Sequence, residues 1–285
     1  MIPIKDFYKS IFFHEISNEY SLREESDKQY NYIFRYLEKI GCKRFLVESD
    51  YIDRDYMDDY SNYYVSCYRM YNKKCKRLHF FKELDEEKFN RIIRGELVVE
   101  DNFKSLRDSY LGFMVVKPLP LTIIGRTVLK TYENTISSGE DKPGSRSIRT
   151  LRCYYSNLFG IDLELESLAF QEQDTVVAAC ATSAIWSALQ KACDLWGYYI
   201  PTPFEITSFS TRYEHTNRPI PSTGLTLSQM AHGIKEVGLE PQVFECIDFN
   251  DRSLKLPLLS ICYSYLRAGV PVILCVDIEE TGGHA

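Results

Sequence analysis

The chain has 285 residues, enough for two ordinary domains, and its 45% hydrophobic and 26% charged residues are ordinary for a globular protein. Its net charge of −6 at pH 7 argues against a general nucleic-acid binder or a binder of acidic membranes, so we expect peptide or protein partners. No apolar run is long enough to span a membrane and the first residues lack a secretory signal, which predicts a cytoplasmic protein.

The first part of the chain predicts alternating helices and strands. Residues 27–40 have an apolar face at helical spacing and precede Gly41, which favours a helix, and residues 43–48 follow as a strand. Tyrosines recur at helical spacing in residues 53–72, which favours a helix with an aromatic face against the lobe; the alternative is a tyrosine-lined partner surface. The basic residues 73–77 then indicate a solvated turn.

Further along, the pattern changes from helix to strands. Residues 85–94 predict a short helix, and residues 111–116 and 122–129 predict two strands around a proline-stiffened turn. Residues 134–150 have no apolar period and are expected to be a loop. Residues 161–166 alternate apolar and acidic side chains, which is typical of a strand with one buried face.

A change in composition near Glu166 predicts two domains. Residues 1–166, rich in tyrosine and carboxylates, are expected to form an α+β N-terminal lobe for recognition or regulation. Residues 167–285 are expected to form the second domain, with a helix over residues 180–196 as its first element. The predicted buried stripe of that helix is Ile185, Ala188, Leu189, Ala192 and Trp196.

The remaining elements lead to a histidine. Residues 198–224 predict a long loop near a cleft, with His215 as a rival base. A capping-box pattern then begins a helix over residues 226–238, followed by a strand at 242–246, a helix at 257–269 and a mostly buried strand at 271–278 that leads to His284. The side chains expected to point inward from the first of these helices are Leu227, Met230, Ile234 and Val237.

Cysteine usage points to chemistry at one position. The nine cysteines are scattered and odd in number, which predicts reduced thiols, and neither a C-x-x-C motif nor metal-ligand histidine spacing occurs, so we expect no metal and no other cofactor. Cys180 stands at the predicted start of a helix, where backbone N–H groups and the helix dipole favour a thiolate. With the imidazole of His284 as base it would be a nucleophile; otherwise it is a buried structural thiol.

Three segments together resemble the papain-like cysteine peptidases of the bacteriocin-processing, double-glycine-leader type. They are residues 171–174 leading to Cys180, residues 224–239, and residues 266–273 leading to Gly282-Gly283-His284. The resemblance implies a papain-like lobe with Cys180 as nucleophile, His284 as base and Gln173 as the oxyanion donor, with Gln171 as the alternative glutamine.

This sequence also departs from the family pattern. Ala181 and Thr182 stand where relatives often have glycine and proline, and the family's orienting asparagine or aspartate and its last strands would lie beyond His284. We expect further C-terminal residues to complete the sheet, since the strand at 271–278 would otherwise lack partners. Two alternatives are that another chain supplies the missing strands, or that the domain is degenerate.

The resemblance implies a cysteine peptidase that cleaves peptide bonds through a thiolate and an imidazole. Two further functions stay open. One is a transglutaminase-like acyltransferase, because the same pair serves both reactions. The second is a peptide-binding or sensor module that keeps the cleft and has lost hydrolysis.

Overall fold

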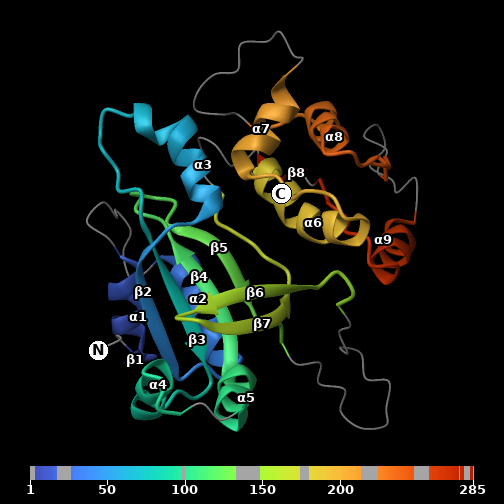
Figure 1. Cartoon of the computed structure of the whole chain (residues 1–285). Coiled ribbons are helices and arrows are strands. Elements are labelled where there is room, and N and C mark those ends of the chain that lie inside the picture. Colours follow the sequence, from blue (N-terminus) through green and yellow to red (C-terminus); the bar gives the residue numbers. More distant parts are fainter. Residues whose placement is uncertain are drawn as a thin grey trace, which may run out of the picture. The chain divides into compact units, whose positions relative to one another are not determined.

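The computed structural model describes residues 4–17, 27–97, 100–132, 148–173, 180–212, 224–246, 257–275, 277–278 and 283–284. Within these residues the chain is a mixed α+β protein with nine α-helices, a five-stranded antiparallel sheet and pairs of short strands, so the α+β class is confirmed (Figure 1). It divides into two compact units: unit 1 is Met1–Ser145 with Cys153–Glu172, and unit 2 is Arg146–Arg152 with Gln173–Ala285. The domain division at Glu166 and the roles assigned to the two domains stay predictions.

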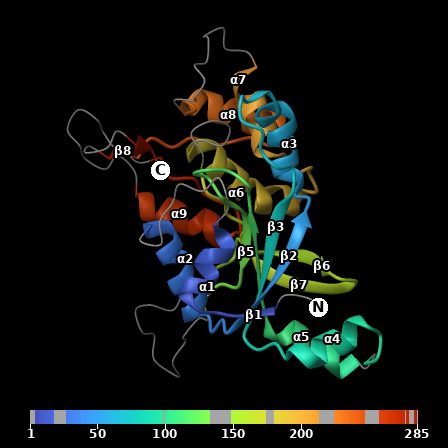
Figure 2. The same cartoon turned by 90° about the vertical axis from the view of Figure 1, so that its left-hand side faces the viewer.

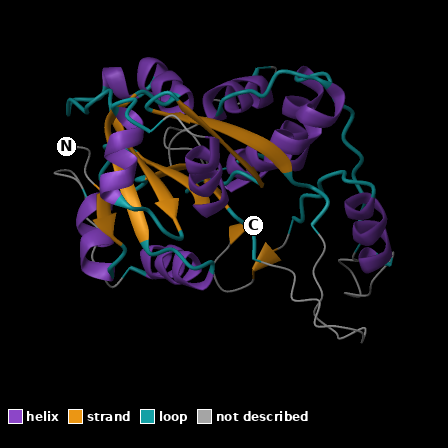
Figure 3. Ribbon diagram, turned by 60° about the horizontal axis from the view of Figure 1, so that its bottom comes forward, coloured by secondary structure: helices purple, strands orange, loops and turns teal. Residues whose placement is uncertain are grey.

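Unit 1 is built on a sheet with the strand order β1-β2-β3-β4-β5, in which every neighbouring pair is antiparallel. The strands are β1 (Ile4–Asp6), β2 (Arg44–Tyr51), β3 (Cys75–Phe81), β4 (Tyr110–Val116) and β5 (Ile124–Leu129). The helices are α1 (Lys9–Ile16), α2 (Lys28–Lys39), α3 (Arg54–Asn62), α4 (Glu86–Ile93) and α5 (Glu100–Ser109), with the short 3-10 turn η1 (Tyr64–Ser66) after α3. A separate pair of strands is formed by β6 (Arg152–Leu158) and β7 (Ile161–Ser167) (Figure 3).

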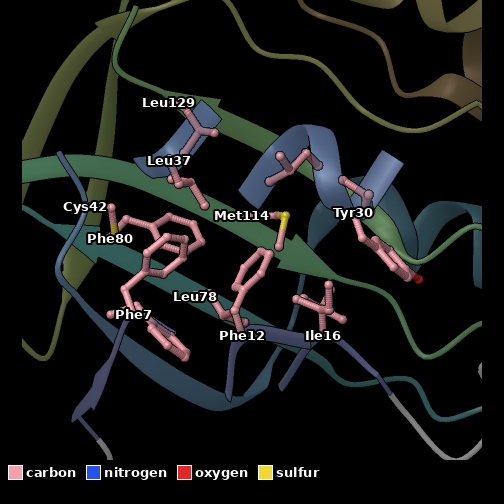
Figure 4. Packing of buried hydrophobic residues seen from close by; sticks show 14 of the residues in the cluster. Phe7, Phe12, Ile16, Tyr30, Leu37, Cys42, Leu78, Phe80, Met114 and Leu129 are labelled. Carbon is pink, nitrogen blue, oxygen red and sulfur yellow. The ribbon is translucent and has the colours of Figure 1, made fainter. Parts of the chain in front are cut away.

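Helices α1 and α2 cover one face of the large sheet, and the β6–β7 pair lies on the other side (Figure 2). Because side chains alternate along a strand, Phe45 of β2 and Phe80 of β3 point to the helical face, where Phe7 and Phe12 pack beside them (Figure 4). Burial of each such side chain contributes about 2 kcal/mol. This apolar layer is the main core of unit 1.

The opposite face of the sheet has a second apolar cluster. Leu46 and Phe81 pack there with residues of α4, α5 and the β6–β7 pair. Strand β7 shows the predicted alternation, with Ile161 and Leu163 buried and Asp162 exposed.

Two predicted helices of unit 1 are confirmed, and in each an aspartate caps the first turn. The Asp27 carboxylate accepts a hydrogen bond from the Gln29 N–H at 2.9 Å at the start of α2, and Asp85 accepts one from the Lys88 N–H at 2.7 Å at the start of α4. The helix predicted over residues 53–72 is only half right, because α3 ends at Asn62. The Asn62 amide donates back to the Asp58 carbonyl, and the following tyrosines and Val65 favour helix weakly.

Unit 2 contains helices α6 (Cys180–Trp196), α7 (Pro203–Thr211), α8 (Leu227–Glu236) and α9 (Leu258–Arg267), and strands β8 (Asp277–Ile278) and β9 (Gly283–His284). The long loop predicted at 198–224 is wrong in part, because it contains α7. Thr202 is the N-cap of α7 and forms a capping box with Glu205, and Pro203 occupies the first helical position. His215 lies outside the described residues. No helix in the described ranges is long and apolar enough to cross a membrane.

The predicted buried stripes of α6 and α8 need two corrections. Trp196, expected to point inward, is 52% exposed, whereas Trp186 is fully buried. Leu227 is 50% exposed, and Met230 is the apolar side chain that α8 buries. Both residues stand at a helix end, Trp196 as the last residue of α6 and Leu227 as the first of α8, and a side chain there is covered only where a neighbouring element extends as far.

The two strands predicted at residues 242–246 and 271–278 do not form as expected. Residues 239–246 have no strand, and of the second segment only Asp277–Ile278 pairs, with β9. Val243, Phe244 and Leu274 are therefore each more than two-fifths exposed. Helix α9 has Ser260, Ser264 and Arg267 on one side and mostly apolar side chains on the other, yet it has no buried residue, which is unusual for an amphipathic helix.

Candidate active site

Cys180 is the first residue of α6, as the helical pattern of the sequence predicts. All nine cysteines are free thiols within the described residues, and Cys180 is the one that stands at a helix N-terminus. The first four N–H groups of an α-helix have no carbonyl partner within the helix, so this end favours negative charge. Its side chain is partly exposed, and a nucleophile must be accessible to its substrate.

Other cysteines lie in surroundings that suppress thiolate chemistry. Cys193, in the same helix, is fully buried, and burial raises the pKa of its thiol to about 11. Burial also raises the pKa of Cys42 to about 12, and that of Cys75 well above its ordinary range. These three cysteines are core residues, and their thiols stay protonated at neutral pH.

A buried hydrogen bond anchors the first turn of α6. The Thr182 hydroxyl lies 3.0 Å from the Thr207 hydroxyl of α7, and both side chains are buried. Helix α7 is in turn packed closely on α8, since a Cβ on Gly233 would stand 2.2 Å from the Ser210 hydroxyl. The helix end that presents Cys180 is therefore held by two neighbouring helices.

The two candidate glutamines differ in their surroundings. Glu172, between them, is held on β5, because its N–H donates to the Ile124 carbonyl at 2.9 Å and its carboxylate accepts from the Ile124 N–H at 3.1 Å. Gln173, the next residue, is exposed. Gln171 is partly buried, and its amide nitrogen is buried without a hydrogen-bond partner. The role of either glutamine as oxyanion donor stays a prediction.

His284 lies in β9, directly opposite Asp277 of β8. The side chain of His284 lies outside what the structure describes, so its pairing with Cys180 stays a prediction. Among the described residues, no cluster of histidine, cysteine and carboxylate side chains could hold a metal ion.

A buried polar cluster in unit 1 was not predicted. His79 of β3 contacts the Tyr110 hydroxyl at 3.1 Å and the Glu48 carboxylate at 3.4 Å, and Tyr110 in turn contacts the Ser156 hydroxyl of β6 at 3.0 Å. Arg77 donates to Glu48 at 2.7 Å and to the Asn157 carbonyl at 2.7 Å. The cluster joins three strands of the sheet to β6.

The cluster is better suited to stability than to catalysis. His79 is completely buried, and Ser156 and Tyr110 are nearly so, which leaves no access for a substrate. Burial lowers the pKa of His79 from 6.5 to about 4, opposed by the hydrogen bond to Glu48. Burial alone would raise the pKa of Glu48, but the His79 hydrogen bond and the Arg77 charge outweigh it, so the pKa of Glu48 is lowered.

The buried imidazole predicts a pH-dependent stability. Between pH 6.5 and about 4 the unfolded chain binds a proton at His79 that the folded chain excludes, so the free energy of unfolding falls as the pH falls, by up to about 3 kcal/mol. Urea unfolding of unit 1 across this range, followed by circular dichroism, measures the slope. His79→Gln should flatten it, whereas His14→Gln, at an exposed site on α1, should leave it unchanged. An identical slope in all three proteins would show that His79 does not cause it.

Comparison of the chain with protein-family models, with curated protein sequences and with solved structures gives no match.

Proposed function

We propose that the chain is a cysteine peptidase whose nucleophile is Cys180 and whose general base is His284, and that residues 167–285 are a papain-like lobe. The observation that supports this most directly is the position of Cys180, partly exposed at the first residue of an anchored helix. Helix α6 begins at Cys180 and strand β9 contains His284, the two residues to which the resemblance assigns the roles of nucleophile and base.

In this mechanism the Cys180 thiolate attacks the carbonyl carbon of a peptide bond, and His284 takes the thiol proton. The imidazolium then returns the proton to the leaving amine, which leaves an acyl group on the sulfur, and water activated by His284 releases it. The N–H groups at the start of α6 and the amide of Gln173 would donate to the oxyanion. The anchor between Thr182 and Thr207 would hold the sulfur in place during both steps.

We also propose that further strands pair with the segments 242–246 and 271–278. Exposed Val243, Phe244 and Leu274 on these segments support the proposal, since apolar side chains at a strand edge are normally covered. A later segment of the same polypeptide is the preferred source, and a partner protein is the alternative. Residues 1–166 would then recognise the substrate or regulate the reaction.

Substitution of the nucleophile tests the proposal. Peptide-library cleavage, followed by mass spectrometry, is expected to fall by about a thousandfold or more in both Cys180→Ala and His284→Ala. Cys262→Ala is the matched control, because Cys262 is also partly exposed but lies inside α9, and it should keep full activity.

Three results would reject hydrolysis by this pair. Equal cleavage by the wild type and Cys180→Ala would exclude the thiol as nucleophile. Products that carry an added amine acceptor in place of water would indicate the acyltransferase. Peptide binding without cleavage, unchanged in Cys180→Ala, would indicate the binding module.

A further inference from the structure

The segment between α3 and β3, residues 63–74, is a loop with a rigid aromatic base; we call it the tyrosine loop (Figure 1). Tyr64 packs against Tyr56 of α3 at 6.1 Å and edge-on against Tyr71 at 5.8 Å between ring centroids. The Tyr56 hydroxyl donates to the Asn72 carbonyl at 2.9 Å. Both ends of the loop are therefore held by contacts that centre on one buried ring.

The outer part of the tyrosine loop exposes large apolar and aromatic side chains. Val65 is 57% exposed, Met70 is 87% exposed and Tyr68 is fully exposed. Single exposed apolar residues are common, but three within six residues on a held loop are not. Tyrosine and methionine are also enriched where proteins bind one another.

The same loop carries positive charge on a chain whose net charge is −6. Arg69, Lys73 and Lys74 are all exposed. The Lys73 ammonium lies 5.6 Å from the Tyr60 ring, and Lys74 pairs with exposed Asp50 at 3.2 Å, a contact that solvent weakens. Cationic side chains around an apolar tip complement a partner with negative charges around apolar side chains.

We propose that the tyrosine loop is a docking surface for an acidic polypeptide segment that carries aromatic or aliphatic side chains. Asp50 beside Lys74 gives this surface both charge signs, which a polypeptide can match with carboxylates and hydrogen-bond donors together, whereas a phosphate backbone or an anionic headgroup layer presents mainly negative charge. A peptide can place a donor or a cation opposite that carboxylate. The site lies within unit 1 and does not depend on the reaction proposed for Cys180.

The probe is a fluorescein-labelled random copolymer of glutamate and tyrosine, and the readout is fluorescence anisotropy with the full chain. We expect saturable binding that weakens with salt, about tenfold weaker binding to Tyr68→Ser/Met70→Ser, and a similar loss with Arg69→Glu/Lys73→Glu. Tyr32→Ser is the matched control, since Tyr32 on α2 is 64% exposed, and it should bind as the wild type does. Because the replaced side chains are exposed, circular dichroism melts should be unchanged.

Three results would overturn the proposal. The first is no binding of the copolymer by the wild type, and the second is equal binding by the wild type and both loop variants. The third is loop-dependent binding to vesicles of phosphatidylcholine with phosphatidylserine, or to a single-stranded oligonucleotide, without binding to the copolymer. Polyglutamate should bind less tightly than the copolymer, since it lacks the aromatic groups that would cover Tyr68 and Met70.

Discussion

Replacement of Gly112 by alanine is expected to unfold the sheet of unit 1. Gly112 lies in β4, between Phe80 of β3 and Leu129 of β5, and has a φ of +116°. A Cβ there would stand 2.0 Å from the Val128 carbonyl oxygen, closer than any real contact allows. Strand β5 would have to move away and lose its ladder hydrogen bonds, so we expect a loss on the order of 4 kcal/mol or more.

Gly160→Ala is the matched control for this prediction. Gly160, in the turn between β6 and β7, also has a positive φ of +88°, but a Cβ there would meet nothing within 4 Å. Gly160→Ala should lower the free energy of unfolding by only about 1–2 kcal/mol, the cost of the backbone conformation alone. Both tryptophans, Trp186 and Trp196, lie in unit 2, so circular dichroism and hydrogen exchange in β4 and β5 are the appropriate measures. Equal losses in the two variants would show that the steric argument is wrong.

Helices with explicit caps and an apolar stripe were predicted well from the sequence. Asp27, Asp85 and Thr226 each accept the hydrogen bond from the N–H expected of an N-cap, and the helices after them follow the predicted ranges closely. These signals depend only on residues close together in the sequence, so they hold however the rest of the chain folds. Helix α7 carries the same signal at Thr202 and Glu205 and was missed inside a long polar stretch.

The central strand β3 was missed for a physical reason. Residues 73–77 were expected to form a solvated turn, because lysine and arginine are rarely buried. Lys73 and Lys74 are indeed exposed, but Arg77 and His79 point to the second face of the sheet, where Glu48, Tyr110 and Ser156 satisfy them. A partner so distant in the sequence leaves no local pattern.

The candidate site was predictable as far as local signals reach. The start of α6 at Cys180 follows from the helical period, whereas its anchor depends on Thr207, which no sequence period connects to Thr182. The strands predicted at 242–246 and 271–278 have the right composition, but a strand also requires a neighbouring strand, and residues 239–246 form no β-ladder with the described part of the chain. The composition of these segments therefore predicted a tendency to form strands, but not which strand each would pair with.

The second large effect is expected from Arg126→Met. Arg126 of β5 pairs with the carboxylate of Asp53, and both are largely buried, with Asp55 close by. The nearby carboxylates raise the pKa of Arg126 although burial opposes this, so the guanidinium stays charged. Methionine would fill similar space but would leave the buried Asp53 carboxylate without its cation, and Asp55 with the half-exposed Arg54 alone, so we expect a loss of about 3–5 kcal/mol.

The pH dependence of this loss distinguishes charge from packing. Burial raises the pKa of Asp55, and Arg126 opposes that rise, so removal of the guanidinium should raise the pKa further. A carboxyl group whose pKa is higher in the folded chain than in the unfolded chain lowers the free energy of unfolding as the pH rises. The free energy of unfolding of Arg126→Met should therefore be closest to that of the wild type under acidic conditions and furthest below it near neutrality. Urea unfolding at both conditions measures this. A loss independent of pH would assign the effect to packing.

Arg54→Met is the control for position. Arg54 also pairs with Asp55, at 3.0 Å, but its side chain is 47% exposed, so solvent screens the pair and the expected loss is below about 1 kcal/mol. Adding Asp53→Asn to Arg126→Met should recover part of the stability, because it removes one buried charge while keeping an acceptor for the N–H groups of Asp55 and Tyr56 at the start of α3. If Arg54→Met lowered the free energy of unfolding as much as Arg126→Met does, burial of the Arg126–Asp53 pair would not be the cause of the loss.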